Sequence, residues 1–570
     1  MPVTDVMTAP ADEEANSAEH RRILVILGAL MMGMALAALD QTIVATALPT
    51  IAGDLHGLNH LSWVVTAYLL ATCISTPLWG KLGDLYGRKS LFQLAIVIFL
   101  VGSMLSGLSH SMVELIAFRA VQGIGAGGLM VGAQAIMGDV VPARQRGRYM
   151  GYFGVVFGVT NVAGPLLGGL FTEHLSWRWI FYINLPLGIA ALFVVAAVLH
   201  IPVKRVPHKI DWWGTAFLSV GVTAIILLTT WAGSEYAWGS PTIIGLGLLA
   251  LATLLIFCWI ETKASEPIIP LWLFKNRTFT ATSGVGFIIG FSMFGAIIYL
   301  PLYLQVVHGA SPTVSGLELL PLICGMLLTF IISGQLVTRT GRYKVFPICG
   351  TAVLALGIGL LTQLGPHTSY REAAVFMFIT GMGIGLCMQV LVVAVQNAVP
   401  YSALGVATAT STFFRTIGGA FGVAVLGAVF ASRLVAGLKA HATAAELKLV
   451  SGANVTANPA QIDHLPAAQH AFVVSAFSHS VESAFVVALP FVILGFILSW
   501  LIKEIPLRTT AFVATTSPDG NQPPSVEANG NMANGNVANG NAANGNVANG
   551  NAAGETVAGP TPAPSVPPVH

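Results

Sequence analysis

Charged residues are scarce in this sequence. Asp, Glu, Lys and Arg make up 9% of its 570 residues, whereas 55% of the residues are hydrophobic. Soluble domains carry about 25% charged residues, so most of this chain must lie in a lipid bilayer rather than in water. The formal net charge of +2 is too small to indicate a nucleic-acid partner.

Cysteine is equally scarce, and the sequence offers no cofactor site. The cysteines lie in apolar segments without metal-ligand spacing, which predicts buried free thiols and neither a metal site nor a disulfide. They are Cys73, Cys258, Cys324, Cys349 and Cys387. No glycine-rich phosphate loop follows a strand-like segment, and the first apolar run is too long for a cleaved signal peptide. We therefore expect no enzyme, no cofactor and no energy source in ATP.

Long apolar runs, in contrast, recur along most of the chain. A membrane span needs about 20 mostly apolar residues, and about fourteen segments meet that test. The sequence therefore predicts an all-α integral membrane protein. The segments are 22–46, 61–79, 91–109, 112–136, 149–171, 180–199, 212–232, 241–260, 279–304, 312–335, 345–363, 372–396, 405–431 and 482–502.

The positions of lysine and arginine predict the orientation of these spans. Positive residues are enriched in cytoplasmic loops, and only Arg178 and Arg371 lie in the short loops predicted to face outward. An even number of spans then places both termini in the cytoplasm and the protein in the cell membrane as a multi-pass protein. The loops predicted to face inward carry Lys81, Arg88, Lys89, Arg144, Arg146, Arg148, Lys204, Arg205, Lys209, Lys263, Lys275, Arg277, Arg339, Arg342 and Lys344.

The two parts of the chain resemble each other. GKLGDLYGRK, which begins at Gly80, matches GQLVTRTGRYK, which begins at Gly334, and FRAVQGIGAGGLM matches FMFITGMGIGLCM further on. Within the first pair of motifs Gly87 matches Gly341 and Arg88 matches Arg342; in the register of the second pair, Pro142 matches Pro400 and Gly147 matches Gly405. We infer two related six-helix bundles with two helices inserted between them, an arrangement typical of secondary transporters.

This repeat predicts the domain organisation. The tail after Arg508 is rich in Asn, Gly, Ala and Pro, and we expect it to be disordered. The predicted parts are a cytoplasmic tail (1–20), a first bundle (21–200), two inserted helices (201–265), a second bundle (266–507) with an outer segment at 432–480, and a low-complexity cytoplasmic tail (508–570).

Asp40 lies inside the first apolar run, where a charged side chain costs roughly 2.5–3.5 kcal/mol. Desolvation favours the protonated form of a carboxyl group, so Asp40 is the first candidate for a proton site. A cationic compound bound nearby would then favour the ionised form and expel the proton. The alternative is that Asp40 hydrogen-bonds neighbours such as Thr42, or pairs with an arginine, and only holds helices together.

Seven motifs in order give the chain a family resemblance. Taken together, they resemble the fourteen-helix drug:proton antiporters of the major facilitator superfamily. The resemblance implies the major facilitator fold and export of amphipathic or cationic compounds in exchange for protons, but it does not fix the substrate. The motifs are LDQTIVATALP (39–49), WVVTAYLLA (63–71), GKLGDLYGRK (80–89), LIAFRAVQGIGAG (115–127), GVTNVAGPLLGG (158–169), WRWIFYINLPLG (177–188) and FFRTIGGAFG (413–422).

The resemblance implies roles for the charged residues of the first half. Arg119 corresponds to an arginine that assists proton transfer or lowers the pKa of a nearby acid, so Asp40 and Arg119 would form a switchable pair; the alternative is a structural ion pair. Gly80, Asp84, Gly87 and Arg88 correspond to a cytoplasmic latch between the halves. An acid that faces a helix N-terminus there would gain roughly 0.3–1 kcal/mol. Because Asp84 and Arg119 become Thr338 and Met377 in the second half, we expect the coupling residues in the first half.

The remaining candidates are glycines and two further charged residues. The glycines of the fifth span allow close helix packing, Pro165 is expected to bend it, and the resemblance marks this motif as typical of exporters. Glu318 is predicted near the outer end of its helix as a second proton or cation site, or as an interfacial carboxylate. Arg415, with Gly418 and Gly419, is predicted to set helix packing near the cytoplasmic side. The motif residues are Gly154, Gly158, Gly164, Pro165, Gly168 and Gly169.

The sequence therefore predicts a proton-coupled exporter of amphipathic or cationic compounds, with multidrug efflux by alternating access. Its partners would be small substrates, protons and the lipid bilayer, and its energy source the proton gradient. Two alternatives remain open: a dedicated exporter of one endogenous metabolite or lipid, and a non-transporting membrane sensor or scaffold.

Overall fold

The computed structural model describes residues 10–55, 61–199, 211–232, 236–310, 312–441 and 467–507. The chain separates into Met1–Ala514 and Thr515–His570, and all of the second unit lies outside the described residues. Apart from one isolated bridge, every regular element in the described residues is helical. The elements are α1 (Pro10–Asp54), α2 (Leu61–Tyr86), α3 (Arg88–Leu108), α4 (Met112–Val140), α5 (Ala143–His174), α6 (Trp179–Tyr182), α7 (Asn184–Val198), α8 (Trp212–Trp231), α9 (Pro241–Glu261), η2 (Leu271–Lys275), α10 (Arg277–Val307), α11 (Pro312–Glu318), α12 (Leu320–Thr340), α13 (Val345–Leu361), α14 (Tyr370–Ala398), η3 (Tyr401–Ala403), α15 (Leu404–His441) and α18 (Ala467–Trp500).

The helices confirm the predicted membrane architecture. Within the described ranges, 13 helices are long and apolar enough to cross a membrane, and α13 is a shorter apolar helix at the place of a predicted span. The span predicted at 312–335 is divided between α11 and α12. Pro321 lies in the first turn of α12 and has no N–H group to continue the hydrogen bonds of α11, which explains the break.

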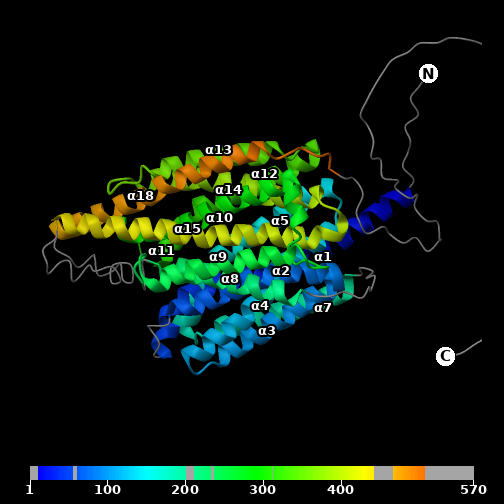
Figure 1. Cartoon of the computed structure of the whole chain (residues 1–570), viewed down its shortest axis with the longest axis horizontal. Coiled ribbons are helices and arrows are strands. Elements are labelled where there is room, and N and C mark those ends of the chain that lie inside the picture. The colour runs from blue at the N-terminus through cyan, green and yellow to red at the C-terminus, as the bar shows by residue number, and fades with distance from the viewer. Residues whose placement is uncertain are drawn as a thin grey trace, which may run out of the picture. The chain divides into compact units, whose positions relative to one another are not determined.

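Two groups of helices form the bundle (Figure 1). The blue and cyan helices of the first half pack on one another, as do the green, yellow and orange helices of the second half. The inserted helices α8 and α9 pack on each other, and α8 also contacts α2 and α15. The halves meet chiefly where α5 packs on α12 and where α2 packs on α15.

Several boundaries differ from the sequence prediction. Helix α1 begins at Pro10, inside the predicted N-terminal tail. Helix α15 continues to His441 and α18 begins at Ala467, so both ends of the predicted outer segment 432–480 are helical. Polar side chains do not end a helix when its backbone hydrogen bonds can continue, so hydropathy alone makes these helices too short. Residues 442–466 and the predicted tail 508–570 lie outside the described part.

The cysteines are free, but not all are buried. Cys73 and Cys387 are buried, whereas Cys258, Cys324 and Cys349 are exposed. A membrane protein carries apolar residues on its lipid-facing surface as well as in its core. The apolar setting of these three cysteines therefore did not imply burial.

Candidate functional site

Asp40 of α1 lies at the centre of a buried polar cluster. Arg119 of α4 donates from Nη1 to Asp40 Oδ2 at 2.5 Å, and Gln122 donates from Nε2 to Asp40 Oδ1 at 2.8 Å. Asn184 of α7 adds a longer hydrogen bond to Oδ1 at 3.3 Å. We call these four residues the Asp40 cluster; they join three helices of the first half.

Aromatic side chains enclose this cluster. The Arg119 guanidinium lies 4.1 Å from the centroid of the Tyr68 ring and 6.0 Å from that of Phe181. The Tyr68 hydroxyl donates to the carbonyl of Ala37, which fixes the ring against α1. Cation–π contacts of this kind gain strength where water is excluded.

The Asp40 cluster has no accessible surface for a ligand in this conformation. Asp40 is 0% exposed and Arg119 is 1% exposed. Arg119 Nε and Asn184 Oδ1 have no hydrogen-bond partner among the described residues. A cationic compound therefore cannot touch the carboxylate here, and the direct competition considered from the sequence would require the cluster to open first.

Sequence reasoning found the pair but not its neighbours. Thr42 does not bond Asp40; its hydroxyl donates to the carbonyls of Ala38, Leu39 and Thr160. Gln122 follows Arg119 by three residues, which puts both on one face of a helix, and this spacing could have identified it.

A second buried cluster lies where α2 turns into α3. Arg88 donates from Nη2 to Asp84 Oδ1 at 2.6 Å and also forms an ion pair with Asp139 at the end of α4. Its Nη1 donates to the carbonyl of Ala135 at 3.1 Å. We call Asp84, Arg88 and Asp139 the Arg88 cluster. Asp139 was missed from the sequence because it lies after a long apolar run with no marker of its partner.

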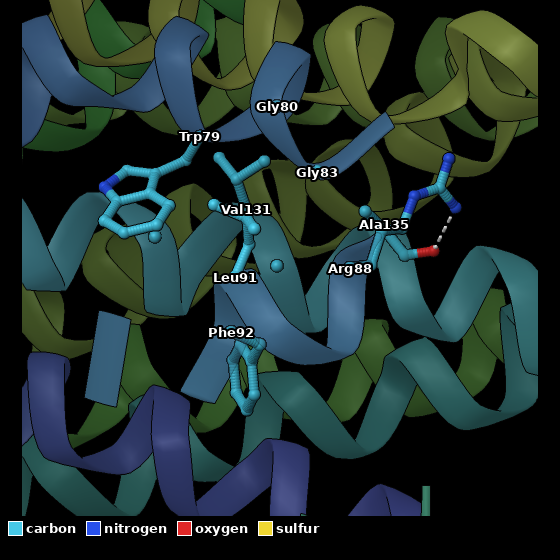
Figure 2. A pocket seen from close by; sticks show the side chains of 10 residues that line it. Trp79, Gly80, Gly83, Arg88, Leu91, Phe92, Val131 and Ala135 are labelled. Atoms are coloured by element: carbon cyan, nitrogen blue, oxygen red, sulfur yellow. Dashed lines mark hydrogen bonds between the residues drawn. The ribbon is translucent and has the colours of Figure 1, made fainter. Parts of the chain in front are cut away.

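A small pocket adjoins this cluster, as Figure 2 shows. Trp79, Gly80 and Gly83 lie on one side of it, and Leu91, Phe92 and Val131 on the other. Arg88 passes its edge to reach Ala135. The pocket belongs to the packing of α2, α3 and α4 within the first half.

Asp84 also connects the two halves. Its Oδ1 accepts from the backbone N–H of Gly405 at 3.0 Å, and its Oδ2 accepts from that of Val406 at 2.8 Å. Gly405 and Val406 are in the first turn of α15, so the carboxylate binds a helix N-terminus whose dipole favours negative charge. A Cβ atom on Gly80 would lie 2.8 Å from the carbonyl oxygen of Gly405, so the backbones need glycine to meet here.

The second half repeats this arrangement with a hydroxyl group in place of the carboxylate. Gly334 of α12 meets Gly147 of α5, which are the repeat partners of Gly80 and Gly405. The hydroxyl of Thr338, in the position of Asp84, accepts from the backbone N–H of Arg148 at 3.1 Å. The two contacts are thus related by the repeat, but only the first carries a charge.

A positive backbone angle occurs in both repeats. Gly87 has φ +95° and Gly341 has φ +69°, and these are the two glycines matched by the repeat. Only glycine adopts this conformation at low cost, which explains why both turns contain it.

The glycines of α5 pack against both halves. Gly154 faces Phe330 and Gly158 faces Leu327, both on α12, whereas Gly164 faces Thr42 on α1. Nothing lies within 4 Å of a Cβ placed on Gly169. Gly168 is buried, and the side chain of Pro165 lies outside the described part. The motif therefore forms the packing surface of α5 at the interface and inside the first half.

Glu318 and Arg415 belong to neither cluster. Glu318 ends α11 and is partly exposed, and its buried Oε2 atom has no partner among the described residues. Gly418 meets the backbone of Phe287 and Gly419 meets the side chain of Phe294, so this part of α15 packs on α10. Arg415 itself lies eleven residues into α15, about 16 Å from its start, and is therefore not near the end of the helix.

The two clusters lie toward opposite ends of the first half. Arg119 and Asp139 are both on α4 and are separated by about 30 Å at 1.5 Å per residue. One end thus holds a buried carboxylate–guanidinium pair, and the other holds a contact between the two halves. Such a combination suits a transporter in which a charge change and a movement of the halves are linked.

Known proteins resemble this chain along most of its length. The family model of the Major Facilitator Superfamily matches residues 30–215 and 212–423. An MFS-type transporter of Mycobacterium tuberculosis is 42% identical over 504 residues, which cover 88% of this chain and 73% of that protein. The multidrug transporter protein MdtP of Bacillus subtilis is 40% identical over 512 residues, 86% of this chain and 94% of that protein.

Solved structures show the same fold at low identity. The human organic anion transporter MFSD10 has a TM-score of 0.59 and 14% identity, covering 84% of this chain and 99% of that one. The proton:xylose symporter XylE has a TM-score of 0.54 and 15% identity, covering 85% and 97%. With the helical fold and the family match together, the chain belongs to the major facilitator superfamily and is a multi-pass membrane transporter rather than an enzyme.

Proposed function

We propose that the protein is a proton-coupled exporter of amphipathic compounds in the cell membrane, with both termini in the cytoplasm. Multidrug efflux is the expected activity, in line with a relative named as a multidrug transporter. The single observation that carries the coupling is Asp40: a carboxylate with 0% exposure inside a transporter, bound by Arg119 at 2.5 Å. A buried charge at this depth is costly and needs a functional reason.

Proton binding to Asp40 would change the cluster. The ionised carboxylate accepts from Arg119 and Gln122, whereas a protonated carboxyl group loses its attraction for the guanidinium. Because α1, α4 and α7 meet at this carboxylate, weakening the pair loosens the packing of the first half. Proton binding to Asp40 is thereby linked to movement of the helices that carry Asp84 and its contact with α15.

The Arg88 cluster supports alternating access. Asp84 holds the N-terminus of α15, and glycines close the interface on both sides of the repeat. This end is closed in the present conformation, and opening it requires Asp84 to release Gly405 and Val406. The positive loops of the sequence put this end on the cytoplasmic side.

The energy is sufficient for export. One charge that crosses 100 mV carries about 2.3 kcal/mol, and one pH unit adds about 1.4 kcal/mol. Together these amount to about 3.7 kcal/mol, so one proton supports a substrate gradient of roughly two to three orders of magnitude.

Proteoliposomes with an imposed pH gradient test this proposal. The purified protein is expected to move a fluorescent amphipathic dye against its gradient, and Asp40→Asn is expected to abolish gradient-driven movement while inserting normally. Undiminished antiport by the variant would contradict the assignment. Transport of a single compound in a broad substrate screen would instead favour a dedicated exporter.

A further inference from the structure

Arg415 of α15 differs from the other buried arginines. Its side chain is partly exposed, whereas those of Arg88, Arg119 and Arg146 are buried. Its position about 16 Å into the helix places this partly accessible guanidinium near the middle of the span.

The guanidinium of Arg415 has no partner among the described residues. Neither a hydrogen bond nor an ion pair reaches its side chain. Arg119 is paired with Asp40, Arg88 with Asp84 and Asp139, and Arg146 donates to the carbonyl of Val141 at 2.8 Å. Each of these three buried arginines thus has a hydrogen-bond or ion-pair partner, whereas Arg415 has none among the described residues.

An uncompensated cation at this depth is expensive unless a ligand supplies the opposite charge. The planar guanidinium presents two parallel N–H groups, which match a carboxylate or a similar oxyanion. Thr416, the next residue in α15, is also partly exposed and could donate a hydrogen bond to the same anionic group.

Apolar residues of α10 lie one turn along α15 from Arg415. Phe294 of α10 packs on Gly419 in the next turn of α15, and its ring is partly exposed. The backbone of Phe287 of α10 meets the same turn at Gly418, and this residue is also partly exposed. A cation one turn away from apolar side chains fits a molecule with an apolar body and an anionic group.

We propose that Arg415 binds the anionic group of the substrate, so that the preferred substrates are amphipathic carboxylates or related oxyanions. This inference rests on the proposed function and narrows its substrate class. It also disfavours the cationic compounds included in the expectation from the sequence, because a like charge would have to approach Arg415.

Binding to the purified protein in detergent tests this proposal without a proton gradient. The probes are pyrenebutyrate, its methyl ester and a pyrenebutyl trimethylammonium salt, which share one apolar body and differ in charge. The wild-type protein is expected to bind pyrenebutyrate at least tenfold more tightly than the ester. Arg415→Gln is expected to remove this preference and leave ester binding unchanged, and Arg415→Lys to keep part of it.

Arg433→Gln is the matched control, since Arg433 is exposed on the same helix. Equal weakening of both probes in a correctly folded Arg415→Gln protein would assign Arg415 to packing and overturn the proposal. A wild-type preference for the cationic probe would overturn it too. So would equal binding of pyrenebutyrate and its ester together with chloride binding that depends on Arg415, because the site would then hold an inorganic anion.

The outcomes separate this proposal from the proposed function. A protein that prefers pyrenebutyrate through Arg415 but shows no proton-driven transport contradicts the exporter and keeps the site. A protein that antiports the ester or the cation but not pyrenebutyrate keeps the exporter and contradicts the site.

Discussion

Gly80 of α2 lies against Gly405 of α15, and a Cβ atom at Gly80 would come within 2.8 Å of the Gly405 carbonyl oxygen. This contact joins the first half of the transporter to the second. It is tight only because neither residue has a side chain, so the interface can be altered selectively.

Gly80→Val is expected to prevent closure at this end of the bundle. Overpacking costs about 1–3 kcal/mol, which lowers the closed population roughly tenfold or more. Transport in proteoliposomes should fall accordingly. The control is Gly83→Ala on the same helix, where a Cβ atom would meet only Arg88 Cγ at 3.5 Å; equal loss in both variants would contradict the account.

Gly334→Val is expected to act like Gly80→Val although it lies in the other half. Gly334 meets the backbone of Gly147, the repeat partner of Gly405. Spin labels at the exposed positions Tyr86 and Arg342 report on the two corresponding loops. Pulsed-EPR distances between them should lengthen in both valine variants, and an unchanged distance in Gly334→Val would show that the repeat is not functionally symmetric.

Asp84→Asn is expected to weaken closure without adding bulk. The variant loses the charge that faces the N-terminus of α15, which is worth about 1 kcal/mol and shifts the population toward the open end roughly fivefold. The same spin-label pair measures this shift. Thr338→Val removes the neutral counterpart, an oxygen that accepts from Arg148 N at 3.1 Å, and should have the smaller effect.

Asp139→Ala is expected to destabilise the folded protein. Removing one partner from a buried ion pair typically costs about 3–5 kcal/mol. Because Asp84 still pairs with Arg88 in this variant, we expect a loss at the lower end of that range. Thermal unfolding in detergent should show a clear decrease in Tm. Glu482→Gln breaks an exposed pair with His479 and should change stability by less than about 1 kcal/mol. A similar decrease in Tm in both variants would show that the Arg88 cluster does not stabilise the folded protein.

Much of the fold follows from the sequence because hydropathy and the repeat are physical consequences of the membrane. Apolar length marks the spans, and the match of Gly80 with Gly334 and of Gly147 with Gly405 anticipated two related halves. The ends of α1, α15 and α18 could not be placed, since a helix continues into water as long as its hydrogen bonds persist.

Only part of the candidate site could be predicted from the sequence. Asp40 and Arg119 are conspicuous because charges are rare in apolar runs, and the structure places them in contact. Asn184 and Asp139 come from α7 and from the end of α4, and only the packing of helices brings them to their partners. The unpaired state of Arg415 was likewise invisible, because pattern alone does not show which arginines have a counter-ion.

The central claim is that Asp40 carries the exchanged proton, and substrate-induced proton release tests it most directly. Purified protein in weakly buffered detergent, observed with a pH indicator dye, should release protons when substrate is added. Asp40→Asn should release none, whereas Asp54→Asn, an exposed carboxylate on the same helix, should behave like the wild type. Proton release from Asp40→Asn equal to that of the wild type would contradict the account.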